Sequence, residues 1–138
     1  MKIILIYFFS TIFVIFLYSL IDIRLFDAFS LAFTTISSGG FVPADNLSNI
    51  IESNLQIFVL SLSLLFPIFN FFLLHDVITR QFSFRNHQED FHLALLIVSL
   101  TLFFYFFVIS NEGFVDVFFA ITSSISTSGI STYSSNFD

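Results

Sequence analysis

The chain lacks cysteine altogether and carries little charge, and both absences narrow the classes of function open to it. Without thiols it can form neither a disulfide framework nor a thiolate metal site. Only 10% of its 138 residues are charged, against roughly 25% in a typical soluble domain. A glycine-rich phosphate loop and a nucleophile elbow are also missing, and the adjacent acids Glu89 and Asp90 lie in a short loop without an accompanying pocket. We therefore expect no enzyme activity.

Apolar residues dominate what is present. They make up 57% of the chain, 24 residues are phenylalanine, and the mean hydropathy is +0.97. They gather in three blocks, over residues 3–21, 55–74 and 91–109. A helix needs about twenty such residues to span roughly 30 Å of hydrocarbon. The sequence therefore predicts an all-α, polytopic membrane protein with three transmembrane helices.

The first block has a second interpretation, because Met1 and Lys2 followed by an apolar run are also typical of a secretory signal peptide. The run here is longer than the usual ~7–15 apolar residues, and no small-residue cleavage motif follows it. These features favour a retained spanning helix.

Basic residues predict the orientation. Lys2 at the N-terminus, and Arg80 and Arg85 in the loop 76–90, place both regions on the cytoplasmic side. The predicted outer segments then contain Arg24 and the acidic residues Asp22, Asp27, Asp45, Glu52, Glu112, Asp116 and Asp138. Charges on the inner side cancel, so the whole formal charge of −6 lies outside. An acidic outer face concentrates cations, and solvation of loops is an equally good explanation of these residues.

An internal repeat is the strongest signal in the chain. The stretch DAFSLAFTTISSGGFVP, from Asp27, aligns without gaps on DVFFAITSSISTSGIST, from Asp116, at an offset of 89 residues. Each copy follows an apolar block. Identical residues fall at the equivalent pairs Asp27 and Asp116, Phe29 and Phe118, Ile36 and Ile125, Ser37 and Ser126, and Gly40 and Gly129.

Each copy is predicted to enter the membrane and turn back within it. Residues 28–36 and 117–125 suit short helices of about 14 Å, with Asp27 and Asp116 as their N-caps. The hydroxyl and glycine residues that follow would turn backbone carbonyls toward an ion path, where non-helical backbone is tolerated. One such segment alone would be read as an ordinary polar loop. Two copies favour a pair of re-entrant pore helices that offer oxygen ligands to a monovalent cation.

At these residues the chain resembles the Trk/Ktr/HKT superfamily of potassium transporters, whose repeated helix–pore loop–helix units surround one ion path. AFSLAFTTISSGGFVP is similar to the second unit of Trk-type subunits, and FFAITSSISTSGIST to the third. FPIFNFFLLHD is similar to the closing helix of the second unit. The resemblance implies one unit over residues 1–75, a cytoplasmic loop over 76–90, and an incomplete unit over 91–138. It further implies a selectivity filter formed by the carbonyls of Ser38, Gly39 and Gly40 and of Thr127, Ser128 and Gly129.

The resemblance predicts potassium uptake across a bacterial inner membrane, with K⁺ as the transported ion and no cofactor. It implies other pieces of the transporter or a second copy as partners, a cytoplasmic nucleotide-binding regulatory subunit, and no nucleic acid. Two alternatives stay open. One is a non-functional remnant of such a transporter. The other is a small membrane haem or electron-transfer subunit that uses His75 and His92, at the inner ends of neighbouring helices.

Overall fold

The computed structural model of the chain describes residues 2–44, 47–69, 88–107 and 113–131, and these ranges contain helices and no strands. The all-α prediction is confirmed to that extent. The helices are α1 (Lys2–Leu20), α2 (Leu25–Ser37), the short 3-10 helix η1 (Leu47–Asn49), α3 (Asn54–Ser63), α4 (Leu65–Ile68), α6 (Gln88–Phe107) and α7 (Phe114–Ile125).

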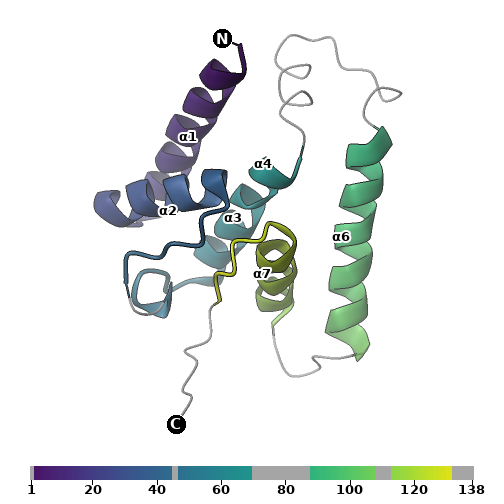
Figure 1. Cartoon of the computed structure of the whole chain (residues 1–138). Coiled ribbons are helices and arrows are strands. Elements are labelled where there is room, and N and C mark those ends of the chain that lie inside the picture. The colour runs from purple at the N-terminus through teal and green to yellow at the C-terminus, as the bar shows by residue number, and fades with distance from the viewer. Residues whose placement is uncertain (1, 45–46, 70–87, 108–112, 132–138) are drawn as a thin grey trace.

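The helices alternate in direction. Figure 1 shows α1 and α6 starting at the same end of the molecule, while α3 and α4 run back between them. Helix α2 lies across the middle of the view and packs against α1 and α4, whereas α7 packs against α3 and α6. Each of these two helices therefore lies against two others.

Among the described residues, α6 is the one helix that is long and apolar enough to cross a membrane. It corresponds to the third apolar block, although it begins at Gln88 rather than Phe91. Residues 88–90 therefore belong to the helix, and the predicted end of the 76–90 loop was wrong. Glu89 and Asp90 lie in the first helical turn, where carboxylates stabilise the positive end of the helix.

The second apolar block is not one continuous helix. Helix α3 ends at Ser63, α4 ends at Ile68, and Phe69 is extended, with φ −77° and ψ 148°. The cause of the break is Pro67. It has no N–H, and in a continuous helix its ring would clash with the carbonyl four residues earlier, that of Ser63. The part of the predicted block from residue 70 onward lies outside the described residues.

Helices α1, α2, α3 and α4 pack around a common core, which contains apolar side chains and a buried hydrogen-bonded hydroxyl. Its buried apolar side chains include Val14, Leu31, Ala32, Leu60 and Leu64. The buried Tyr18 hydroxyl lies 3.5 Å from Thr35 Oγ1, and Ser63 is a second hydrogen-bonding partner. One hydroxyl group of α1 therefore links α2 and α3.

Gln56 fastens the start of α3 to the end of α1. Its Oε1 accepts hydrogen bonds from the backbone of Glu52 (2.8 Å) and Ser53 (3.2 Å), while Ser53 Oγ accepts from the Gln56 backbone N–H. This is a capping box. Gln56 Nε2 also donates to the Ile21 carbonyl at 2.9 Å. The position of α2, which lies between α1 and α3 in the chain, depends on this junction.

Candidate ion-coordinating segments

The two short helices begin at equivalent positions of the repeat. The N-cap of α2 is Arg24 and that of α7 is Gly113, which are 89 residues apart, and neither residue makes a side-chain capping hydrogen bond. The prediction that Asp27 and Asp116 are N-caps was therefore wrong, because each helix starts three residues earlier than expected. Both carboxylates lie in the first turn, close enough to the positive helix end to stabilise it.

The segments that follow the helices repeat the same backbone conformation. Ser38 has φ 53° and its equivalent Thr127 has φ 59°, while Gly40 has φ 68° and its equivalent Gly129 has φ 64°. Left-handed backbone costs a residue with a side chain roughly 1–2 kcal/mol. Such strain repeated at equivalent positions indicates a conformation that the surrounding structure imposes on both segments.

Hydrogen bonds hold this conformation in the same way in each copy. Thr34 Oγ1 donates to the Phe41 carbonyl at 2.6 Å, and the equivalent Ser123 Oγ donates to the Ile130 carbonyl at 2.6 Å. The backbone N–H of Gly39 donates to the Thr34 carbonyl at 3.0 Å, and that of Ser128 donates to the Ser123 carbonyl at 3.2 Å.

Sequence analysis missed Thr34 and Ser123. The available signal was a hydroxyl residue at the same position of both copies, six residues before Gly40 in the first and six residues before Gly129 in the second. A hydroxyl there can reach the carbonyl of the residue after the glycine. It closes the turn from the helix side.

The second segment carries additional side-chain hydrogen bonds. Ser128 Oγ lies 3.0 Å from Ser126 Oγ and 3.2 Å from Ser123 Oγ, and all three hydroxyls are buried. In the first copy the residue equivalent to Ser128 is Gly39, which has no hydroxyl to contribute. Residues 127–129 are therefore held by more side-chain hydrogen bonds than residues 38–40, for which the Thr34 bond to Phe41 is the counterpart of the Ser123 bond to Ile130.

The two segments meet at Gly40 and Ser128. A Cβ atom on Gly40 would overlap the backbone carbonyl oxygen of Ser128, so only glycine fits there. Figure 1 shows the segment after α7 passing beside the end of α2 near the middle of the molecule. The structure thus brings the six predicted filter residues, Ser38 to Gly40 and Thr127 to Gly129, into two neighbouring segments.

The chemistry at this position is that of backbone and hydroxyl oxygens. The carboxyl ends of α2 and α7, which carry partial negative charge, both lead into the segments. Among the described residues no group of three or more His, Asp or Glu side chains converges on a point. A cation held here would be bound by neutral oxygens, which suits a monovalent ion that exchanges quickly.

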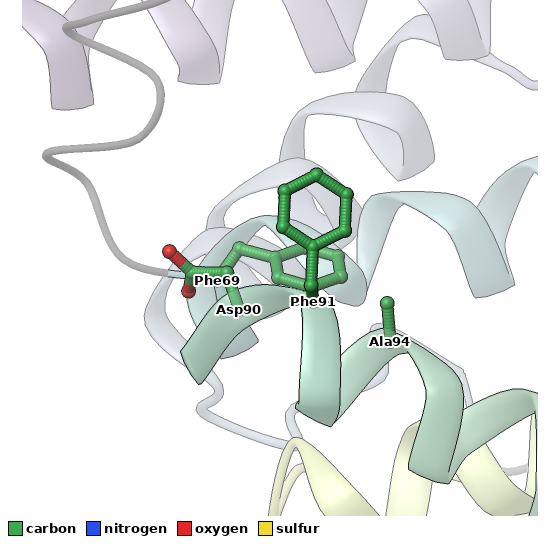
Figure 2. Close-up of a pocket in the computed structure, with 4 residues that line it drawn as sticks. All are labelled: Phe69, Asp90, Phe91 and Ala94. Atoms are coloured by element: carbon green, nitrogen blue, oxygen red, sulfur yellow. The ribbon is translucent and has the colours of Figure 1, made fainter. Parts of the chain in front are cut away.

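Other predicted residues lie elsewhere. His92 is exposed in the first turns of α6, with Nδ1 2.6 Å from the Gln88 carbonyl, and His75 and His87 lie outside the described residues. A cavity of about 180 Å³ borders the same end of α6. Figure 2 shows it lined by the Phe69 and Phe91 rings and Ala94, with the Asp90 carboxylate directed to one side. It has none of the converging polar groups of a catalytic pocket.

Comparisons with protein-family models, with curated proteins and with solved structures give no significant match to this chain.

Proposed function

We propose that the chain is part of a Trk-type potassium-uptake system in the inner membrane of a bacterium, with residues 38–40 and 127–129 lining the ion path. The observation that carries this proposal is the repetition of one unusual turn at an offset of 89 residues. Both the positive φ angles and the hydroxyl-to-carbonyl hydrogen bonds recur at equivalent residues. A left-handed residue ends many helices, so the support for a shared role comes from the combination of these angles with the same hydrogen bonds at equivalent residues.

A membrane setting is supported by the apolar side chains on the outside of the helices. Leu95 and Phe107 of α6 are 72% and 79% exposed, and Ile4 of α1 is 72% exposed. In water, contiguous apolar surface of this kind promotes association. In lipid it is the ordinary outer face of a helix. We infer that α1, the α3–α4 segment and α6 cross the bilayer, with the N-terminus, residues 76–87 and the start of α6 on the cytoplasmic side.

In this arrangement α2 and α7 are re-entrant pore helices. Potassium would lose part of its hydration shell to the carbonyl oxygens of the two segments, and the helix ends would favour its positive charge. Acidic residues on the outer side, such as Asp27 and Glu52, would raise the local cation concentration. An inward-negative membrane potential supplies about 2.3 kcal/mol per 100 mV for each ion carried inward.

Two segments surround only part of an ion path. Further pieces of the transporter, or a second copy of the chain, would supply the rest. The loop 76–90, of which residues 76–87 lie outside the described part, is the proposed contact for a cytoplasmic nucleotide-binding regulatory subunit.

Growth of an uptake-deficient bacterium on low potassium tests the function. The chain would be expressed alone and with the genes that flank its own, and Gly40→Ser would be compared with Ser30→Ala, a matched change on an exposed face of α2. Rescue that is abolished by Gly40→Ser and kept by Ser30→Ala supports transport through this segment. If no combination rescues growth although membrane insertion is verified, the chain is a remnant without transport activity.

A further inference from the structure

The contact between the two segments involves one glycine position from the first copy and one residue from the second, and the equivalent residues of the two copies do not repeat it. Gly40 of the first copy receives the carbonyl of Ser128 from the second. Their equivalents have no such contact among the described residues. No described residue lies within 4 Å of the place where a Cβ on Gly129, the equivalent of Gly40, would be, and Gly39, the equivalent of Ser128, is exposed.

A cavity of about 190 Å³ lies beside Gly129. It is bordered by one face of α7, including Ala120 and Ser124, and by the segment that follows the helix. Ala120 and Ser124 are exposed, whereas the equivalent residues of α2, Leu31 and Thr35, are completely buried. The same helix face is therefore covered in the first copy and uncovered in the second. The cavity is lined by both hydroxyl and apolar side chains. Hydroxyl groups can bond to the backbone of a polypeptide segment, and apolar groups can pack against it.

We propose that the cavity beside Gly129 receives residues 38–40 of a second copy of this chain, so that the Gly39 carbonyl of one copy packs against Gly129 of the other. The contact would reproduce between chains the contact that Gly40 and Ser128 make within one chain. Each chain has both Gly39 and Gly129. Two copies related by a two-fold axis would therefore form this contact twice, with each chain supplying Gly39 to one contact and Gly129 to the other.

The association rests on the contact geometry alone. Its consequence for transport, a closed path lined by four segments from two chains, rests on the proposed function. The two claims can therefore fail separately: cross-linking reports the association, and potassium uptake reports the function.

Cysteine cross-linking tests the association directly, because the chain has no cysteine of its own. Ser37 is exposed, and a Cβ atom added to Gly39 would lie 3.0 Å from its Oγ, so the two residues are adjacent. Ser124 lines the cavity. Chains with Ser37→Cys and with Ser124→Cys, carrying different tags, would be co-expressed and treated in membranes with a short bis-maleimide. We expect a mixed-tag dimer from this pair. Ser37→Cys paired with Leu95→Cys, on the lipid-facing side of α6, should give none.

A second experiment fills the cavity with a larger side chain, so that the proposed contact can no longer form. Ser124→Phe would fill the cavity and should convert pairs to single copies when fluorescently labelled chains are counted by photobleaching in lipid bilayers. Leu95→Phe, a similar increase in size on an exposed face, should leave pairs intact. The proposal is overturned if Ser37→Cys and Ser124→Cys both react with maleimide but never cross-link. It is equally overturned if Ser124→Phe leaves the count of pairs unchanged.

Discussion

Thr34 donates a hydrogen bond from its hydroxyl to the carbonyl of Phe41, seven residues along the chain, at 2.6 Å. The bond crosses the turn formed by Ser38, Gly39 and Gly40 and holds its far end against the last turn of α2. Ser123 and Ile130 repeat the bond at 2.6 Å after α7. Thr34 and Ser123 are both buried, whereas Phe41, whose carbonyl accepts the first bond, is 67% exposed.

Removing the Thr34 hydroxyl should loosen the first segment. Thr34→Val keeps the side-chain shape but leaves the Phe41 carbonyl without its donor, at a cost of about 1–3 kcal/mol. Thermal unfolding in detergent, followed by tyrosine fluorescence, would measure the loss. Ser30→Ala is the control, because its exposed hydroxyl bonds only within the helix. Equal stability of Thr34→Val and Ser30→Ala would show that the bond does not hold the turn.

Alanine at the two equivalent glycines should have unequal effects. Gly129→Ala adds the strain of a left-handed residue, about 1 kcal/mol, because no described residue lies within 4 Å of the new methyl group. Gly40→Ala adds the same strain and also displaces the Ser128 carbonyl, so we expect a clearly larger loss of stability. Unfolding of the single copy in dilute detergent is the appropriate measurement, since association between copies is then absent. Losses of the same size would contradict the close packing of the two segments.

The repeat is visible in the sequence, and it predicts where the backbone turns. Glycine at positions 40 and 129 made positive φ at both residues predictable, whereas positive φ at Ser38 and Thr127 was not predictable from residue type. Helix starts were harder to predict. A polar residue at Asp27 resembles an N-cap, yet the helix extends back to Leu25 because Arg24 is followed by apolar residues that continue it.

Long-range contacts were not predictable from the sequence. The approach of Ser128 to Gly40 and the Tyr18 contact with Thr35 depend on how helices pack, which no local pattern records. The sequence shows Pro67 inside the second block, but the place where α3 ends and α4 begins is known only from the structure.

Gln56 should matter more than its position outside the ion-coordinating segments suggests. Gln56→Met keeps the side-chain length but removes the acceptor for Glu52 and Ser53 and the donor to Ile21. Each lost bond costs about 1 kcal/mol, so we expect a loss of 2 kcal/mol or more. Thermal unfolding in detergent would measure it, with Gln88→Met at the exposed start of α6 as the matched control. A loss no larger than that of the control would mean that the junction between α1 and α3 does not depend on Gln56.

The orientation in the membrane can be tested with single cysteines, again because the chain contains none. Glu52 and Gln88 are both exposed, at the start of α3 and of α6, and the proposed topology places them on opposite sides. In intact cells a membrane-impermeant maleimide should label Glu52→Cys at once and Gln88→Cys only after permeabilisation. Leu95→Cys, 72% exposed but lipid-facing, should resist the reagent in both states because thiolate forms poorly in hydrocarbon. Rapid labelling of Leu95→Cys in folded protein would place α6 in water, and the three-helix membrane arrangement would then be wrong.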